Sequence, residues 1–449
     1  MQEKASYGPL PWQRLIVLTG AALVLYLLCG WLRLASPSER FHATVPLLWL
    51  VDVLYYQRHR RDVRWSYVII GILGAGLGLL AGLWLLLAQQ ARALGGTVDW
   101  REIVCELYFV ASIFVLYSVL CALLTQLIGV IPGARATLAA PHGWWLRYVR
   151  MSLAIILFVP YLFTTFNIHR FKSANATNPK LACGLPYEEV KFAATDGVAL
   201  SGWFIPAKQS RATVLVCHGV GANKGNFLGI VPFLHRASFN VFLFDFRGHG
   251  DSAGHTISFG YYEARDVRGA VDYLLRRRDS GRILAYAFSM GGSALLHAMP
   301  HLPEVRGVVV DSTFAEMAPL ARQQMALLPW GLDTAMFKAT DFYTRLEIGI
   351  HASAITPRRY IGGISPRPLL IIHGLADKLI PPTQAKSNYA AARRPKELWL
   401  VNGADHCACR AVAEALYERR VAAFLRRCVR RNEPRNRSNR AGMIIEGVS

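Results

Sequence analysis

Ser289 lies in a stretch of small residues that could turn its hydroxyl into a nucleophile. The stretch Ala287–Gly292 follows the apolar run Arg282–Tyr286, which predicts a short buried strand, and precedes Ser293–Ala298, which predicts a helix. A nucleophilic serine at a sharp strand-to-helix turn needs small residues two positions before and after it. Such a turn aims the first N–H groups of the helix at the reacting centre, where an oxyanion would develop.

Two further side chains with suitable chemistry lie just past later strand-like runs. Asp377 follows Leu369–Ile372, and His406 follows Leu398–Val401. A serine hydroxyl needs an imidazole to take its proton, and the imidazole needs a carboxylate to fix its tautomer and stabilise its charged form. Because functional residues of an open parallel sheet sit at the carboxyl ends of its strands, the three side chains are expected to meet there.

Two other carboxylates compete for the role of the orienting acid. Asp311 follows another strand-like run, Val305–Val310, and is the alternative to Asp377. Asp405 adjoins His406, but on a short loop it would point elsewhere, so we interpret it as a solvated loop residue. Asp377 is therefore the predicted acid.

The region from about residue 185 alternates short apolar runs with amphipathic segments, which predicts a mostly parallel, doubly wound α/β sheet with helices on both faces. It opens with Glu188–Ala194 and Val198–Ile205, a predicted hairpin around Thr195-Asp196-Gly197, because Asp-Gly between apolar runs favours a tight turn. The other predicted strands and helices are Ala212–Cys217, Val241–Phe246, helix Glu263–Arg276, helix Pro382–Ala392 and a helix over 410–427.

Residues 185–428 resemble the α/β-hydrolase family, and most of all its serine esterase, thioesterase and aminopeptidase-like branch. The resemblance rests on six signals in family order: Asp196-Gly197-x-x-Leu200-x-Gly202-Trp203, His218-Gly219, Asp245-x-Arg247-Gly248-x-Gly250-x-Ser252, Ala287-x-Ser289-x-Gly291-Gly292, His373-Gly374-x-x-Asp377 and His406.

The resemblance implies a catalytic role for each matching residue. Ser289 would be the nucleophile, His406 the general base and acid, and Asp377 the orienting carboxylate. The backbone N–H groups of Met290 and Val220 would form the oxyanion hole, and removing one such donor typically costs a factor of about 10²–10³ in kcat.

The resemblance also implies supporting roles and one departure. His218 would brace the loop that carries Val220, while Asp245 and Arg247 would organise the turn after their strand. The segment 312–362, rich in Met, Leu and Phe, would form a cap over the site. Its apolar residues have two interpretations of equal weight: they bind an acyl or otherwise lipophilic substrate, or they pack the cap onto the core. Ala287 stands where the family usually has Gly, so some local strain is expected there.

The first 170 residues have a different character and are predicted to form an all-α transmembrane region. The chain is 53% hydrophobic and only 18% charged, and this deficit of charge falls almost entirely before residue 170. About 20 apolar residues suffice to cross a bilayer. We predict four or five spanning helices, a linker at 171–184 and the hydrolase domain at 185–428; the spans are 15–32, 43–56 (undecided), 66–88, 103–131 and 151–166.

The net charge of +21 is assigned to Arg-rich loops and to a basic tail at 429–449, which is expected to be disordered. Since the arginines flank apolar runs and a tail, with no recognisable nucleic-acid module, the expected partners are a lipid bilayer and no nucleic acid. Lys and Arg are enriched in the loops 57–65 and 132–150 relative to 89–102, which places the catalytic domain on the non-cytoplasmic side.

These patterns together predict a membrane-anchored serine hydrolase that cleaves an ester, thioester or amide in an acyl or peptide substrate through an acyl-enzyme. The alternative is a catalytically idle binding or scaffolding module on a membrane bundle. No cofactor and no metal are expected. The chain has eight cysteines but no pair of zinc-type knuckles, and the His406-Cys407-Ala408-Cys409 spacing suits a metal poorly.

Overall fold

The computed structural model of the chain describes residues 131, 159–161, 163–165, 167–170, 172–325 and 332–430. The chain divides into two compact units, Met1–Thr165 and Phe166–Ser449. The segments predicted to span a membrane lie outside the described residues, apart from residue 131 and short pieces of 159–165. Within the described ranges, no helix combines the length and the apolar character needed to cross a bilayer. The predicted basic tail is described only as far as Arg430.

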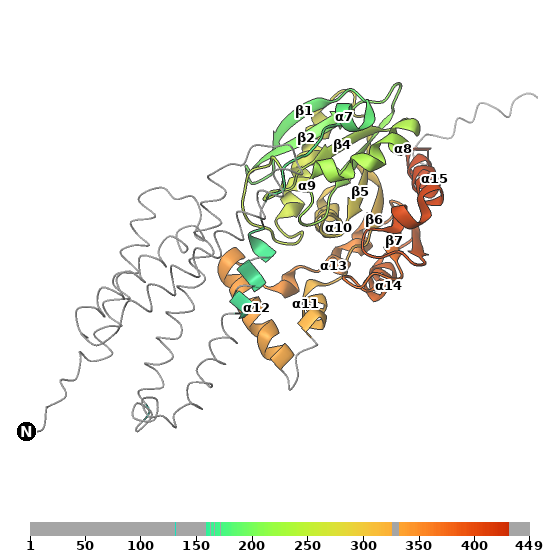
Figure 1. The fold of residues 1–449 in the computed structure, drawn as a ribbon. Helices are drawn as coiled ribbons and strands as arrows, with labels where there is room; N and C mark the ends of the chain where they lie inside the picture. Colours follow the sequence, from blue (N-terminus) through green and yellow to red (C-terminus); the bar gives the residue numbers. More distant parts are fainter. Residues whose placement is uncertain are drawn as a thin grey trace, which may run out of the picture. The chain divides into compact units, whose positions relative to one another are not determined.

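A sheet of eight strands, all within the described residues, forms the centre of the second unit (Figure 1). Its order is β1-β2-β4-β3-β5-β6-β7-β8; β2 pairs antiparallel with β1 and β4, and every other neighbouring pair is parallel. The predicted mostly parallel sheet is thereby confirmed. The strands are β1 (Glu188–Ala193), β2 (Ala199–Ile205), β3 (Ala212–Cys217), β4 (Asn240–Phe244), β5 (Arg282–Phe288), β6 (Val305–Asp311), β7 (Leu369–Gly374) and β8 (Lys396–Val401).

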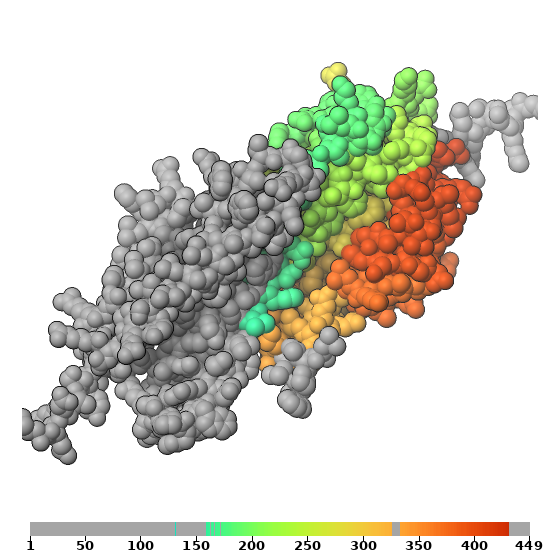
Figure 2. Space-filling view, viewed as in Figure 1, coloured from blue at the N-terminus to red at the C-terminus, as the bar shows by residue number. Residues whose placement is uncertain are grey.

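Helices cover both faces of this sheet, so the strands β3 to β7 are buried on both sides, while the edge strands β1 and β8 are more exposed. One apolar core lies under α9, α10, α13 and α14, and a second lies under α8 and α15. Figure 2 shows α15, in red, as part of the outer surface of this unit. The helices are α7 (Pro179–Cys183), α8 (Val231–Arg236), α9 (Glu263–Arg276), α10 (Met290–Ala298), α11 (Met317–Met325), α12 (Leu332–Ile348), α13 (Arg358–Ile361), α14 (Pro382–Ala391) and α15 (Cys409–Arg430); short 3₁₀ turns are η2 (Lys224–Ile230), η3 (Met299–His301), η4 (Ala352–Ala354) and η5 (Gly362–Ile364).

Strand β5 shows how the sequence divides between the two cores. Ile283, Ala285 and Ala287 enter the first core, while Leu284, Tyr286 and Phe288 enter the second. Successive side chains of a strand point to opposite faces, so an unbroken apolar run is needed when both faces are covered. This central strand ends one residue before Ser289, which fixes where the serine emerges.

The segment expected to act as a cap is largely helical. Between β6 and β7 the chain forms α11, α12 and α13, with residues 326–331 outside the described ranges. Phe314, Ile350 and Ile355 of this segment pack with Ile380 in a small apolar cluster of their own. The cap thus has an interior, separate from the two cores of the sheet.

The stretch expected to be a linker at 171–184, with the domain starting at 185, belongs structurally to the second unit. The compact unit begins at Phe166, and the polar residues after it are hydrogen-bonded to loops of the sheet. Asn178 caps the short helix α7, whose Leu181 N–H donates to its Oδ1 at 3.0 Å. Several of the other polar residues bond to partners about 50 or more positions away, which no local pattern reveals.

Candidate active site

Ser289 stands at a strained turn between β5 and α10. Its backbone has φ 50° and ψ −119°, a conformation that costs an L-residue roughly 1–3 kcal/mol. The surrounding structure holds it there, since the Ser289 N–H donates to Asp311 O at 2.9 Å and Gly292 N–H donates to Ser289 O at 3.0 Å. This backbone conformation places Ser289 beyond the end of β5, immediately before the first residue of α10.

The two glycines after the serine are required by close packing. A Cβ on Gly291 would lie 2.4 Å from His218 O, and a Cβ on Gly292 would lie 1.8 Å from Thr313 Oγ1. Ala287, by contrast, sits fully buried in β5, paired with Cys217 on one side and with a strand β6 residue on the other. The strain expected at Ala287 is therefore found at Ser289 instead.

The structure brings the three predicted side chains together at the carboxyl ends of β5, β7 and β8. His406 Nε2 lies 3.0 Å from Ser289 Oγ, and His406 Nδ1 lies 2.8 Å from Asp377 Oδ2. Ser289 is 6% exposed and the His406 imidazole is 20% exposed, so the site is shielded yet open on one side. The two distances, 3.0 Å to Ser289 Oγ and 2.8 Å to Asp377 Oδ2, show that both ring nitrogens of His406 are within hydrogen-bonding distance of a partner.

Asp377 is held in its ionised form by its neighbours. Burial alone raises the pKa of this carboxyl, but hydrogen bonds from His373, His406 and the Ile380 N–H outweigh burial and hold the pKa well below its ordinary value. The Ile380 N–H reaches Oδ1 at 2.8 Å, and His373 Nε2 lies 3.3 Å from Oδ2. A carboxylate that stays charged can stabilise an imidazolium next to it.

Backbone N–H groups that could receive an oxyanion lie next to the serine. Met290 is the first residue of α10, and Val220 follows Gly219, where a Cβ would lie only 3.3 Å from Ser289 Cβ. Among the described residues, neither N–H has a hydrogen-bond acceptor. Both N–H groups are thus free to donate to a bound ligand.

The chain is similar to a known protein family and to several known proteins. A family model of the alpha/beta hydrolase fold matches residues 212–342. The uncharacterized protein YfhR of Escherichia coli is 32% identical over 228 residues, which cover 49% of this chain and 73% of YfhR. The chain belongs to the α/β-hydrolase family. This α/β hydrolase is also 29% identical to the uncharacterized YqkD of Bacillus subtilis, over 51% of this chain and 76% of YqkD.

Two more similarities were found for this α/β hydrolase. The α/β hydrolase domain-containing protein WAV2 of Arabidopsis thaliana is 29% identical, over 47% of this chain and 69% of WAV2. Among solved structures, an esterase of Pyrococcus furiosus is 25% identical with a TM-score of 0.47, over 58% of this chain and 97% of that chain.

Two buried histidines brace the loop of this hydrolase that carries Val220. His218 Nε2 accepts the Phe246 N–H at 3.0 Å, so its Nδ1 carries the proton and donates to Gly219 O at 2.7 Å. His249 Nε2 accepts the Gly221 N–H at 3.2 Å. Burial lowers the pKa of both imidazoles, which keeps them neutral and able to accept. The sequence predicted the bracing role of His218 but gave no role to His249, whose partner lies 28 residues away.

A fully buried ion pair anchors the same loop. Lys224 Nζ lies 2.5 Å from Asp245 Oδ2, with neither side chain exposed, and Asp245 Oδ1 also accepts the Lys224 N–H at 2.7 Å. Arg247 pairs with Asp266 and Asp196 on the other side of the turn. Asp245 and Arg247 therefore organise their turn, as the sequence predicted.

The two competing carboxylates do not contact the imidazole of His406. Asp311 Oδ2 accepts the Tyr417 hydroxyl at 2.5 Å, and Oδ1 accepts the Ser312 hydroxyl at 2.9 Å. Asp405 Oδ1 accepts the backbone N–H of His406 at 2.8 Å and so fixes the loop. Of the three acids, only Asp377 hydrogen-bonds the His406 ring within the described structure.

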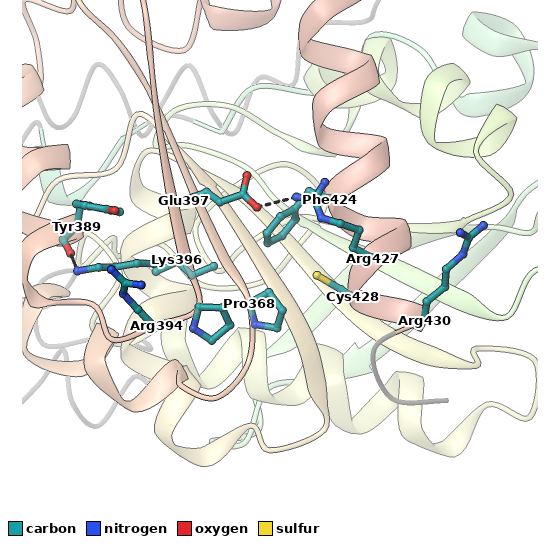
Figure 3. Close-up of a pocket in the computed structure, with 11 residues that line it drawn as sticks. Pro368, Tyr389, Arg394, Lys396, Glu397, Phe424, Arg427, Cys428 and Arg430 are labelled. Carbon is teal, nitrogen blue, oxygen red and sulfur yellow. Dashed lines mark hydrogen bonds and ion pairs between the residues drawn. The ribbon is translucent and has the colours of Figure 1, made fainter. Parts of the chain in front are cut away.

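A large cavity of the hydrolase unit lies apart from Ser289, and no cluster of metal-binding side chains is present among the described residues. The described residues include no group of three or more His, Cys, Asp or Glu side chains placed to hold a metal ion. A cavity of about 810 Å³ lies at the amino ends of β7 and β8, lined by Pro368, Lys396, Phe424 and Arg427 among others (Figure 3). Because Ser289 lies at the carboxyl ends of the strands, this cavity belongs to the opposite edge of the sheet.

Proposed function

We propose that this chain is a serine hydrolase with Ser289 as nucleophile, His406 as general base and acid, and Asp377 as the orienting carboxylate. The observation that carries the proposal is the imidazole of His406, which lies 3.0 Å from Ser289 Oγ and 2.8 Å from Asp377 Oδ2. Family membership alone does not fix an activity, so the proposal rests on this geometry.

The proposed reaction has two steps. His406 Nε2 takes the Ser289 proton as Oγ attacks the carbonyl carbon, and the N–H groups of Met290 and Val220 stabilise the oxyanion. His406 then gives the proton to the leaving alcohol, thiol or amine, which leaves an acyl-enzyme. A water molecule, deprotonated by His406, attacks the acyl carbon and releases the acid and Ser289.

We propose a small-molecule substrate with a lipophilic acyl group. Leu375 and Leu379, two residues on either side of Asp377, are 45% and 51% exposed, and Phe342 and Leu346 on α12 of the cap are 61% and 65% exposed. Exposed apolar side chains gathered near a catalytic loop and on a cap are suited to an acyl chain. The bond cleaved is an ester, thioester or amide.

We further propose that the enzyme is a multi-pass membrane protein with its catalytic domain on the non-cytoplasmic side. Apolar runs in the first 170 residues and the distribution of Arg between their loops support this topology. A reporter that is active only in the cytoplasm, fused after Arg430, should be silent. An active reporter would refute this orientation.

A fluorophosphonate probe tests the catalytic proposal on the full chain. The wild type should be labelled covalently, and Ser289→Ala should not. Ser293→Ala is the matched control, because Ser293 is equally buried one turn along α10 and its hydroxyl has no partner in the described structure. Labelling that persists in Ser289→Ala would refute the assignment. No labelling and no turnover of ester, thioester or aminoacyl substrates would favour the idle binding or scaffolding module.

A further inference from the structure

The loop that carries Val220 is held from outside by the chain segment that enters the hydrolase unit. This loop, residues 218–223, runs from the end of β3 to the start of η2. Asn223 caps η2 and is 2% exposed, and its Nδ2 points at three oxygens of the entering segment. These are Ser173 O at 3.0 Å, Ser173 Oγ at 3.2 Å and Ala174 O at 3.1 Å.

Asn175 continues this attachment with its own carboxamide. Its Oδ1 accepts the Gly225 N–H at 3.1 Å, while its Nδ2 donates to Asp251 Oδ2 at 2.8 Å and to Asp245 Oδ2 at 3.3 Å. Asp245 is the buried partner of Lys224, so Asn175 joins the same charged anchor that holds the start of η2. This one side chain therefore ties the entering segment to the start of η2 and to Asp245 and Asp251, at the two ends of the turn after β4.

The same segment reaches the cap a few residues earlier. Ile168 is 2% exposed and packs with Phe314, Ile355 and other apolar residues of the cap cluster. His169 Nε2 lies 3.0 Å from Glu347 Oε2 on α12. Arg170 lies against the Val220 loop, because a Cβ on Gly221 would be 3.3 Å from Arg170 Nη1. The described residues of the segment 167–175, which are 167–170 and 172–175, thus contact the cap and the Val220 loop together.

We propose that Asn175 is a positioning residue, and that residues 167–175 hold the Val220 loop where its N–H can meet the oxyanion. This inference rests on the proposed serine hydrolase function. The loop is also fixed by β3 at one end, by His249 at Gly221 and by the Lys224–Asp245 pair at its far end. Asn175 bonds Asp245 as well, so loss of the bonds from Asn175 and Asn223 loosens the far end and leaves it to the Lys224–Asp245 pair alone. A misplacement of about 1 Å at a catalytic group can cost about 10²-fold in rate.

The test compares Asn175→Ala with Asn178→Ala in the full chain. Asn178 is the same residue type three positions later, and its side chain caps α7 without touching the Val220 loop. Asn175→Ala should lower the rate of fluorophosphonate labelling and the kcat on a p-nitrophenyl ester by about 10- to 100-fold, with KM nearly unchanged. Asn178→Ala should stay within about twofold of wild type.

A second variant and a second readout separate positioning from folding. Asn223→Asp keeps the oxygen that caps η2 but replaces the donating amide with an oxygen that faces Ser173 and Ala174, so it should show the same loss. The affinity for a trifluoromethyl ketone, whose tetrahedral adduct carries an oxyanion, should fall by the same factor as kcat/KM. A purely structural role would not produce this match.

Each outcome decides between the two proposals. If the wild type is not labelled, the serine hydrolase proposal fails. If the wild type is labelled and Asn175→Ala matches Asn178→Ala, the positioning role fails while the hydrolase proposal stands. Unchanged affinity for the ketone, or loss of the fold in both Asn175→Ala and Asn223→Asp, would also overturn the positioning role.

Discussion

Replacing Asp377 by asparagine would invert the hydrogen bond that orients His406. In the structure, Asp377 Oδ1 accepts the Ile380 N–H at 2.8 Å, and Oδ2 accepts from His406 Nδ1 at 2.8 Å. The asparagine oxygen would keep the bond to Ile380, which turns its NH₂ group towards His406. The imidazole would then carry its proton on Nε2, and an N–H would face the Ser289 hydroxyl that it should deprotonate.

The size of the effect follows from the loss of the general base. An Asp-to-Asn change that preserves geometry but imposes the wrong tautomer lowers kcat by about 10⁴-fold in a Ser-His-Asp triad. At about 1.36 kcal/mol per factor of ten, this is about 5 kcal/mol of transition-state stabilisation. The fold should survive, because Asp377 is replaced by a side chain of the same shape.

The assay measures kcat on an ester substrate and the rate of fluorophosphonate labelling. The melting temperature of each variant should equal that of the wild type, which shows that the fold is intact. Asp405→Asn is the matched control: Asp405 adjoins His406 but accepts from the backbone N–H groups of His406 and Lys378 and not from the imidazole, and an amide oxygen also accepts both bonds. The control should keep activity within about threefold. If Asp377→Asn retains more than a tenth of wild-type activity, or Asp405→Asn loses as much as it does, Asp377 is not the orienting acid.

Three further outcomes follow from packing and charge. Gly292→Ala should lower the free energy of unfolding in urea by about 1–3 kcal/mol or more, because its Cβ would overlap a threonine hydroxyl, whereas Gly363→Ala, with open space around it, should not. Lys224→Met should cost about 3–5 kcal/mol by stranding a buried carboxylate, while the exposed Lys208→Met should be silent. Because the pKa of Asp377 in the folded protein lies below its ordinary value, its charge stabilises the fold above pH about 4. The free energy of unfolding should therefore fall as the pH is lowered towards the folded pKa, and Asp377→Asn should lack this part of the pH dependence.

Much of the sheet and the site geometry could be predicted because the signals are local. Strand β3 is an unbroken apolar run that ends at a His-Gly pair, and α9 shows one apolar face from Glu263 to Arg276, so both matched their predicted bounds. Ser289, Asp377 and His406 each follow the last apolar residue of a strand. Strand β5 extends two residues beyond its predicted end, because Ala287 and Phe288 stay in register with β3 or β6 up to the turn.

The supports of the site could not be predicted because their partners are distant in sequence. Asn175 bonds residues 50 to 76 positions away, and a polar stretch of this composition is equally typical of a solvated linker. Lys224 was not singled out, since lysine is rarely buried and the distant carboxylates Asp245 and Asp251 explain its place inside. The predicted membrane spans and tail fall outside the described residues and stay predictions.

The attachment of residues 167–175 to the Val220 loop sets where a recombinant catalytic fragment should begin. A fragment cut at 185, where the strand pattern starts, would lose Asn175 and leave the amide of Asn223 without its three acceptors. A fragment cut at 212, where the family match starts, would also lose β1 and β2 from the sheet edge. A first residue no later than 167 keeps every contact that this segment makes with the Val220 loop, so the structural unit is longer than the region by which its family is identified.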